Sequence, residues 1–478
     1  MKIPEWLPDA HHPTGPEQEP RKALVEPWLR PIVRFLHIEA AGGFVLLACT
    51  AVALILANSP WSSPFAELWQ TRIGFTVAGF ELYKPLLLWI NDGLMTVFFF
   101  VIGLEIKREI VFGELRDPRK AALPAAAALG GMVVPAVLYL LVQGSGSGAR
   151  GWGIPMATDI AFVVGFLALL GSRVPFGLKI LLLTLAIVDD IGAILVIAVA
   201  YSAETSLAFL VIGTASFGII YLFRRIGVRP VPVYVFLGAG IWLAFLKSGV
   251  HPTVAGVVLG LLTPASPWFA RRSLAKVAEG VALSLGQDRD TDEMEHHEQA
   301  VQLMTATARE TVSPLDRLET ALHPWVAFGI MPLFALANAG VKVKLSDVAD
   351  PVALAVVAGL VLGKPLGIVA FSWVAVKLGL ARLPSGVNWK ILLGAGCLAG
   401  IGFTMSLFIA GLALEGELLA AGKIGTLLGS TLSALAGLGL LWYFLRRSNG
   451  HQAAGAGVDV AAASPPPADD GEERNTCP

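Results

Sequence analysis

The chain has 478 residues, of which 55% are hydrophobic and 15% charged, and its formal net charge is −1. Soluble globular proteins carry roughly 25% charged residues, so this composition excludes an ordinary soluble domain. A net charge near zero provides no basic surface, and we expect no nucleic-acid partner. Apolar runs of about 20 residues recur along the chain, as in membrane-spanning helices. The composition therefore predicts a multi-pass membrane protein.

Residues 1–37 are polar and contain prolines, with no short apolar stretch before a cleavage site, so we expect a cytoplasmic segment and no signal peptide. The apolar runs that follow predict about twelve spans. Two of them, 232–246 and 250–263, are short and are either tilted or incomplete crossings. The expected spans are 38–58, 88–104, 121–143, 153–170, 177–200, 206–223, 232–246, 250–263, 325–341, 352–376, 389–413 and 424–445.

Three segments differ from these runs. Residues 59–87 contain "RIGFTVAGFELY", whose alternating apolar and polar residues around Ala-Gly predict a short β-hairpin near 71–83. Residues 264–322 are polar and predict a long, partly helical loop, in which the pair His296-His297 is an incidental feature rather than a metal site. The tail, residues 446–478, is rich in Ala, Pro, Gly and acidic residues and predicts disorder.

The basic residues of the connections predict the orientation in the membrane, because cytoplasmic connections carry an excess of Lys and Arg. With the N-terminus inside, every inside connection is basic and the outside connections carry few such residues. Both termini are then cytoplasmic, and the predicted hairpin is extracytoplasmic. The inside connections hold Lys107, Arg108, Arg116, Arg119, Lys120, Arg173, Lys179, Arg224, Arg225, Arg229, Lys377, Arg382 and Lys390.

Ionisable side chains within the apolar runs are costly in a membrane and are functional candidates by default. Asp159, Lys364 and the adjacent pair Asp189 and Asp190 lie well inside such runs. Apolar residues flank Lys364 on both sides, which favours a buried role over snorkelling to the interface. A structural ion pair would explain one aspartate of the adjacent pair but not two.

Two other charged groups lie near the ends of a predicted span. Asp92 is near its outer end, and we expect it to be a cap or to have a local partner. Glu105, Lys107, Arg108 and Glu109 are near the inner end. They are either a solvated helix end with local ion pairs or a functional group, and the pattern alone leaves both interpretations open.

The adjacent aspartates predict competition between a proton and a cation. Neighbours on a helix are about 100° apart, so both side chains can reach one water-filled cavity. Two carboxylates this close and partly desolvated bind a proton more readily than an isolated one, and their oxygens are ligands for a small hard cation. Asp159 and the Thr158 hydroxyl add oxygens from another span, and Lys364 can neutralise one aspartate when no cation is bound. If only a loaded site crosses the membrane, competition becomes exchange.

Two predicted spans contain helix breakers ahead of a threonine. Gly151, Gly153 and Pro155 precede Thr158 in one, and Gly400 and Gly402 precede Thr404 in "GCLAGIGFTMSLFIAG". Paired interrupted spans indicate a transport site between opposed half-helices. We therefore expect spans three to five and ten to twelve to form an inverted repeat. The alternative is that these glycines only allow close helix packing.

The chain resembles the NhaA-type bacterial sodium/proton antiporters along nearly all of residues 35–445. The resemblance rests on the ordered runs "WINDGLMTVFFFVIGLEIKRE", "GWGIPMATDIAFVVGFLALLGSRVP", "LAIVDDIGAI", "LKSGVHPTVAGV", "LHPWVAFGIMPLFALANAGV", "GKPLGI" and "GIGFTMSLFIA". It implies an all-α membrane protein of about twelve helices, with an inverted-repeat core in which two discontinuous helices, spans four and eleven, cross. We expect the 264–322 loop and the tail to be longer than is usual in the family.

The resemblance also implies an activity: electrogenic, pH-regulated exchange of Na+ or Li+ for protons by alternating access in the bacterial inner membrane. Such exchange serves sodium tolerance and intracellular pH homeostasis. No cofactor and no enzymatic activity are implied, and the transported ions and the lipid bilayer are the expected partners. The hairpin resembles the one through which these proteins form homodimers.

Residue roles follow from the resemblance by position. Asp190 resembles the main carboxylate that binds Na+ or Li+, and Asp189 resembles the partner of Lys364. Thr158 and Asp159 fall in one unwound segment. The other unwound segment holds Gly402, Phe403 and Thr404. The residues linked to pH response are Glu105, Arg108, Glu109 and His251, although a lone histidine at a span end is more often structural.

Two other functions are compatible with membrane aspartates. An intramembrane aspartyl protease needs its two aspartates on facing helices, whereas Asp189 and Asp190 are adjacent. A passive cation channel needs a continuous pore, and no carbonyl-lined filter or repeated pore loop is evident. Proton movement driven by Na+ distinguishes the antiporter from both.

Overall fold

The computed structural model describes residues 39–77, 80–202, 205–228, 231–267, 278–279, 302, 304–305 and 311–462. The predicted N-terminal segment 1–37, the pair His296-His297 and the last part of the tail, 463–478, lie outside the described residues.

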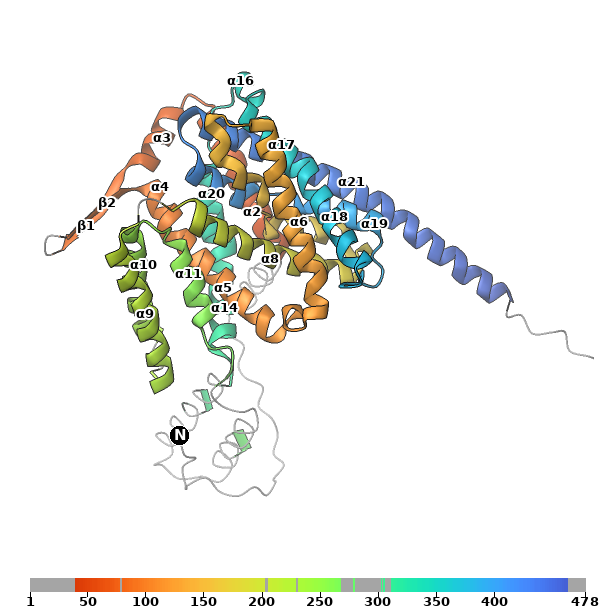
Figure 1. Ribbon diagram of the computed structural model, residues 1–478, viewed down its shortest axis with the longest axis horizontal. Coiled ribbons are helices and arrows are strands. Elements are labelled where there is room, and N and C mark those ends of the chain that lie inside the picture. Colours follow the sequence, from red (N-terminus) through yellow and green to blue (C-terminus); the bar gives the residue numbers. More distant parts are fainter. Residues whose placement is uncertain are drawn as a thin grey trace, which may run out of the picture.

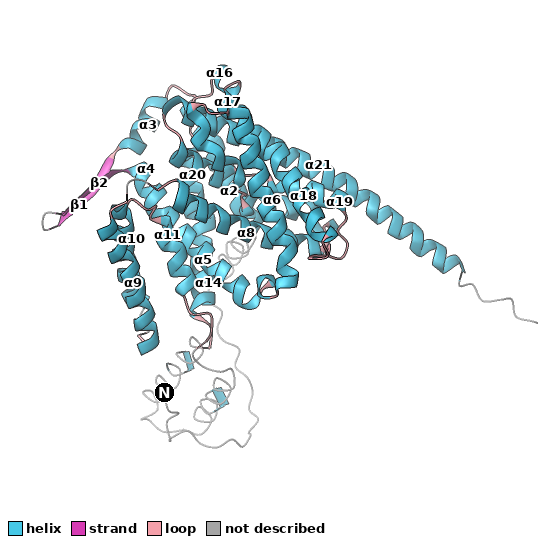
Figure 2. Ribbon diagram, in the orientation of Figure 1, coloured by secondary structure: helices cyan, strands magenta, loops and turns pink. Residues whose placement is uncertain are grey.

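The described chain is a helical bundle with one small two-stranded sheet (Figures 1 and 2). Its α-helices are α2 (Glu39–Ala57), α3 (Ser62–Gln70), α4 (Leu86–Leu88), α5 (Met95–Phe112), α6 (Pro118–Gln143), α7 (Ile160–Leu170), α8 (Phe176–Ala200), α9 (Leu207–Ile226), α10 (Val231–Ser248), α11 (Thr253–Leu262), α14 (Pro314–Trp325), α15 (Met331–Asn338), α16 (Leu345–Val348), α17 (Pro351–Ala358), α18 (Lys364–Lys377), α19 (Trp389–Ala399), α20 (Phe403–Ala413) and α21 (Gly416–Ala462).

Short 3₁₀ and π-helical segments connect or extend these helices. The π-helical turns interrupt long helices without breaking them, and π-turns of this kind are frequent near functional residues. The 3₁₀ segments are η2 (Glu114–Arg116), η3 (Ser147–Met156) and η4 (Gly171–Arg173), and the π-helical ones are η1 (Trp89–Leu94), η5 (Val326–Ile330) and η6 (Gly359–Gly363).

Eight helices of the described chain are long and apolar enough to cross a membrane, and counting each bent helix pair as one span raises the number to eleven. The bent pairs are α2 with α3, η3 with α7, and α19 with α20. α11 is apolar but shorter. These helices agree with a multi-pass membrane protein, and the number twelve stays a prediction.

Polar residues just before the helices determine where several of them begin. Asn388 accepts a hydrogen bond from the Ile391 backbone N–H at the start of α19, and Ser313 accepts one from the Asp316 N–H at the start of α14. These side chains satisfy backbone donors that have no partner within the helix, which is worth about 1 kcal/mol each.

Glycines bring α6 and α18 into close contact at the centre of the bundle. A side chain on Gly367 would come within 2.0 Å of the Gly130 backbone oxygen, and one on Gly130 within 2.2 Å of the Gly367 oxygen. Only glycine allows backbones to approach this closely, as between helices in membranes. The contact buries the start of α18, including the Lys364 side chain, which is fully buried.

The hairpin consists of β1 (Arg72–Val77) and β2 (Phe80–Pro85), which pair in antiparallel register from Arg72 opposite Pro85 to Val77 opposite Phe80. The Trp89 indole N–H donates to the Ile73 carbonyl oxygen at 2.8 Å and joins the hairpin to η1. The second strand extends two residues beyond the predicted end of the hairpin at 83. The sequence prediction also missed α3, an amphipathic helix between α2 and the hairpin.

Two segments outside the predicted spans contain helix. α14 begins at Pro314, within the segment 264–322 that was predicted to be a long, partly helical loop, because the amphipathic run "PLDRLETALHPW" packs one face on the bundle. α21 continues to Ala462, beyond the predicted span end at 445 and into the tail predicted to be disordered from 446. Its alanines favour helix, whereas the prediction counted them together with Pro, Gly and acidic residues as a sign of disorder.

Two ends of the bundle can be distinguished in Figure 1. The hairpin side carries β1, β2 and α16, where the Asn58 side chain at the end of α2 bonds the Val341 carbonyl oxygen. The loop side is where α11 ends and α14 begins, and there the Leu315 N–H donates to the Pro264 oxygen. The two ends are called the hairpin side and the loop side.

Candidate functional site

α8 carries both adjacent aspartates into the interior of the bundle. Asp189 is 1% exposed and Asp190 3%. The Lys364 ammonium, fully buried at the start of α18, lies 2.6 Å from Asp189 Oδ2 and also donates to the Met156 carbonyl oxygen at the end of η3. Charged groups this deep are costly to bury unless they are paired with each other and hydrogen-bonded.

The two aspartates differ in what they contact. Asp189 is held by Lys364 through Oδ2, whereas its buried Oδ1 has no hydrogen-bond partner among the described residues. Asp190 makes no hydrogen bond or ion pair with any residue that the structure describes. One carboxylate of the pair is therefore neutralised by a lysine, and the other is available to a proton or a cation.

A break between η3 and α7 forms one wall of the site. The two helices are bent by 42° across it, and Ala157 and Asp159 are extended. Asp159, 2% exposed, is the cap of α7 and accepts from the Phe162 N–H at 3.5 Å. The glycines and Pro155 that precede this break explain why the helix does not continue.

A second break, between α19 and α20, faces the first. These helices are bent by 49°, and the residues between them are Gly400, Ile401 and Gly402. A side chain on Gly402 would come within 2.1 Å of the Ser406 hydroxyl and 3.0 Å of the Ala157 oxygen, so the approach requires glycine.

Direct hydrogen bonds join the two breaks. The Asp159 N–H donates to the Ile401 oxygen at 2.7 Å, and the Thr158 hydroxyl donates to the Ala399 oxygen at 2.9 Å. In return, Asp159 Oδ2 accepts from the Thr404 N–H at 3.1 Å and from the Thr404 hydroxyl. Backbone groups freed by each break are thus satisfied by the other, as buried polar groups require.

The charges beside the breaks match the partial charges of the helix ends. Asp159 lies at the N-termini of α7 and α20, where a negative charge is favourable, and Lys364 donates to the C-terminus of η3, where a positive charge is favourable. Asp159 and Thr158 therefore join the two breaks, and their role as oxygen ligands of an ion stays a prediction.

The structure brings eight of the predicted residues together and places the others apart. The group around the aspartates consists of Asp189, Asp190, Lys364, Thr158, Asp159, Gly402, Phe403 and Thr404. The Phe403 N–H donates to the Ser430 hydroxyl of α21 at 3.1 Å. This serine contacts the second break but was not predicted, because a serine within a long apolar helix resembles many others.

Glu105, Arg108 and Glu109 lie on α5 toward the loop side, where they contact α14 and α8. Arg108 forms an ion pair with Glu319, His323 Nδ1 is 4.0 Å from Glu105 Oε1, and the Thr184 hydroxyl is 3.4 Å from Glu109 Oε1. Sequence analysis singled out neither Glu319, which lies in the predicted loop 264–322, nor His323, which follows it. Their spacing of four residues, which puts them on one helix face, was a usable signal.

His251 lies apart from these residues, on the hairpin side between α10 and α11. Its Nδ1 is 2.7 Å from the Thr253 hydroxyl, and its Nε2 is 3.8 Å from Asp92 Oδ1. Asp92 in turn forms an ion pair with Lys84 of β2 at 2.9 Å. The expectation that Asp92 has a local partner is confirmed.

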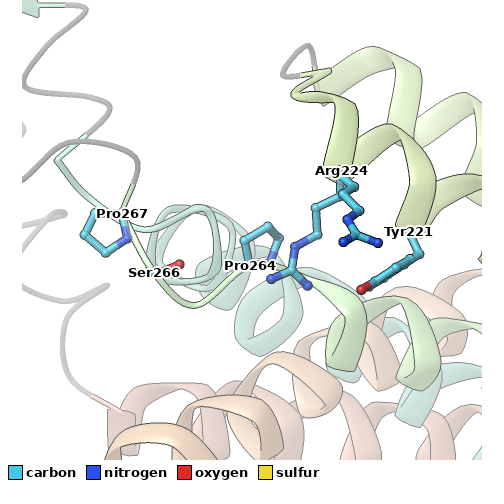
Figure 3. A pocket seen from close by; sticks show the side chains of 6 residues that line it. Tyr221, Arg224, Pro264, Ser266 and Pro267 are labelled. Carbon is cyan, nitrogen blue, oxygen red and sulfur yellow. The ribbon is translucent and has the colours of Figure 1, made fainter.

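A separate cavity of about 290 Å³ lies on the loop side, at the end of α9 and beyond α11 (Figure 3). Tyr221, Arg224, Arg225, Pro264, Ser266 and Pro267 line it. None of the predicted ion-binding residues is among them, so this cavity does not belong to the aspartate site.

Comparison with known proteins gives matches over most of the chain. A family model described as Na+/H+ antiporter 1 matches residues 33–441. The Na(+)/H(+) antiporter NhaA of Rhodopirellula baltica is 52% identical over 421 residues, which cover 88% of this chain and 96% of the relative. Na(+)/H(+) antiporter NhaA 2 of Sorangium cellulosum is 50% identical over 455 residues, 93% of this chain and 96% of the relative. The Rhizobium meliloti Na(+)/H(+) antiporter NhaA is 51% identical over 409 residues, 85% and 93% respectively.

Proposed function

Because this chain belongs to the Na+/H+ antiporter family, we propose that it exchanges Na+ or Li+ for protons at Asp189 and Asp190, electrogenically and by alternating access. The observation that carries the proposal is a buried Lys364–Asp189 ion pair beside an Asp190 that has no partner among the described residues. The named relatives are antiporters rather than enzymes, and both aspartates lie on one helix, which argues against an aspartyl protease.

The exchange step follows from the contacts of the two aspartates. A cation entering the site displaces the proton held by Asp190, is coordinated by that carboxylate and competes with Lys364 for Asp189. Once the cation has taken the Asp189 carboxylate, the buried lysine loses its counter-ion and releases a proton, because a lone ammonium is costly there. In the other half of the cycle, protons bind again to Lys364 and Asp190 and expel the cation. Net charge then crosses the membrane, which couples exchange to the potential at about 2.3 kcal/mol per charge per 100 mV.

The paired breaks support alternating access. Hydrogen bonds between Asp159 and Thr404, and between Thr158 and Ala399, make the two interrupted spans one unit around the site. We propose that this unit is the crossed pair of an inverted repeat and that it moves against the remaining helices. The twelve crossings are then the eight long helices, the three bent pairs and α11 as the short eighth span.

We further propose that the loop side faces the cytoplasm and the hairpin side the outside of a bacterial inner membrane. The bias of Lys and Arg toward the loop-side connections supports this orientation. Extrusion of Na+ in that direction would serve sodium tolerance and intracellular pH homeostasis. The hairpin, which projects from the bundle in Figure 1, would pair with a second copy to form a homodimer.

Regulation by pH is proposed for the α5 residues on the loop side. Glu105, Arg108 and Glu109 each contact a residue of another helix, so a change in protonation there can alter how α5 packs against α14 and α8. His251 is proposed as a second pH-responsive position, supported by its distance of 3.8 Å from Asp92.

A vesicle assay tests the proposed function. The purified protein is reconstituted, a pH gradient is imposed, and Na+, Li+ or K+ is added while an internal probe reports pH. We expect Na+ and Li+ to drive proton movement in the alkaline range. Absence of any Na+-dependent proton movement would exclude antiport, and Na+ flux without protons would indicate a channel.

A further inference from the structure

One aromatic side chain of the broken helix contacts rings from three other parts of the chain. The Phe408 ring on α20 lies 5.7 Å from Phe99 of α5, 6.1 Å from Phe334 of α15 and 5.3 Å from His251, measured between ring centroids. These four residues are called the ring cluster below.

The ring cluster is closely packed. Phe99, Phe334 and Phe408 are at most 2% exposed, and His251 is 9% exposed. The His251 and Phe334 rings meet Phe408 edge to face, at 86° and 63°, which is a favourable geometry for aromatic pairs. Buried apolar rings in contact offer a hydrated ion no polar partners, so its passage between them is costly.

The ring cluster lies between the aspartate site and the hairpin side. α20 begins at the second break and leads away from it, so Phe408 is one helical turn beyond Thr404, about 6 Å along the axis. Phe99 is in the first turns of α5, next to η1, which is bonded to the hairpin. An ion leaving the aspartates toward the hairpin side therefore meets these rings first.

The four rings are held by different parts of the structure. The Asn338 amide donates to the Phe334 oxygen at 3.1 Å and pairs with Asn91 of η1, and His251 is held by Thr253 and Asp92. Phe408 instead belongs to α20, whose first turn bonds Asp159 through Thr404. A movement of the broken-helix unit would carry Phe408 away from the other three rings.

On the basis of the proposed function, we infer that Phe408 is a gate residue: its ring closes the path between Asp189–Asp190 and the hairpin side, and opening requires α20 to withdraw it from Phe99, Phe334 and His251. Exchange requires such a gate, because the gate keeps the ion site open to only one side of the membrane at a time. Phe408 is not an ion ligand.

Labelling of a buried cysteine tests the gate without transport. In a background with Cys49, Cys397 and Cys477 replaced by Ser, Thr404→Cys places a thiol in the group around the aspartates, four residues before Phe408. Because this change also removes the hydroxyl that bonds Asp159, every labelling rate is compared with that of the Thr404→Cys protein as parent. A membrane-impermeant maleimide is applied from the hairpin side of oriented vesicles. Since removing a buried ring strongly weakens packing, we expect Phe408→Ala to raise the labelling rate by about tenfold or more. An unchanged rate would overturn the gate.

Two further variants keep the test decisive. Phe245→Ala removes a ring of similar burial on α10, where it contacts Phe217, away from the path. It should leave labelling at the parent rate, and an increase equal to that of Phe408→Ala would mean general loosening and overturn the proposal. If Phe408→Ala does not fold, Phe334→Ala removes a partner ring from the other side and should raise labelling as well; if it does not, the proposal fails.

Transport separates this inference from the proposed function. With the gate absent, Phe408→Ala should show downhill Na+ flux that moves several-fold fewer protons per Na+ than the parent protein. Unaltered coupling together with unaltered labelling would reject the gate while antiport stands. A parent protein that moves no protons in response to Na+ would reject antiport, whatever the labelling result.

Discussion

The protein contains two Lys–Asp ion pairs of similar length in very different surroundings. Lys364 and Asp189 lie 2.6 Å apart and are 0% and 1% exposed, whereas Lys84 and Asp92 lie 2.9 Å apart and are 27% and 13% exposed. The first pair joins α18 to α8 beside an unpaired carboxylate, and the second joins the hairpin to η1 at the edge of the bundle.

The difference shows that burial, rather than distance, determines what an ion pair can do. A pair near water is screened and contributes about 0–1 kcal/mol, so it serves local structure. A fully buried pair balances a large desolvation cost against attraction, and removal of one partner leaves an uncompensated charge. A cation or proton arriving at Asp190 can therefore alter the Lys364–Asp189 pair. The neighbour of the Lys84–Asp92 pair is instead the His251 ring, 3.8 Å from Asp92 Oδ1, which offers no second carboxylate to a cation.

The largest expected effect is that of Asp190→Asn. The amide keeps the shape of the side chain but cannot carry the charge that a cation or proton neutralises, so Na+-driven proton movement should fall to background in vesicles. Lys84→Met, which removes the half-buried Lys84–Asp92 pair and leaves Asp92 in place beside His251, is the control and should retain most of the exchange. Normal exchange in Asp190→Asn would contradict the site assignment.

Breaking the buried pair should lower stability as well as impair exchange. Asp189→Asn leaves the Lys364 ammonium without its counter-ion, and the loss should be about 3–5 kcal/mol. Adding Lys364→Met to Asp189→Asn removes the orphaned charge and should restore part of that stability. The midpoint of thermal unfolding in detergent measures the stability of the single and the double variant. A double variant less stable than Asp189→Asn would argue against a buried charged pair.

A smaller effect is expected where the two breaks meet. Thr404→Val removes the hydroxyl that donates to Asp159 but keeps the backbone N–H bond, so about 1.5–3 kcal/mol should be lost. Thr404→Ser retains the hydroxyl and should behave almost as the parent protein. Equal thermal stability of the Val and Ser variants would show that this hydrogen bond does not hold the breaks together.

The smallest effect is expected for Lys84→Met. This change removes the exposed pair while keeping an apolar stem, and stability should decrease by about 0–1 kcal/mol, less still at high salt. Exchange should be retained. A loss of stability as large as that of Asp189→Asn would remove the contrast between the two pairs.

The aspartate site could be predicted because polar residues are conspicuous in apolar runs. Asp159, Asp189, Asp190 and Lys364 are expensive in a membrane, and the glycines near Thr158 and Thr404 indicate interrupted helices. The family resemblance, which rests on these same runs, is confirmed. What single residues could not reveal is that Asp159 serves the two breaks, since that depends on a contact with a helix some 245 residues later.

The features that escaped prediction consist of ordinary residues in specific contacts. Phe408 and Phe334 look like any core phenylalanine, and only their placement around one ring distinguishes them. Glu319 was hidden in the predicted loop 264–322, because α14 is amphipathic rather than uniformly apolar and its helix depends on packing against α5. Tertiary contacts stabilise such helices more than the local sequence does.

The most direct test of the central claim is the apparent affinity of the purified protein for Na+ at a series of pH values. If Na+ and protons compete at Asp190 and the Asp189–Lys364 pair, affinity should fall by about tenfold per pH unit for each competing proton as the medium becomes more acidic. Asp190→Asn should bind Na+ weakly at every pH. A Na+ affinity that does not change with pH would contradict competition at one site.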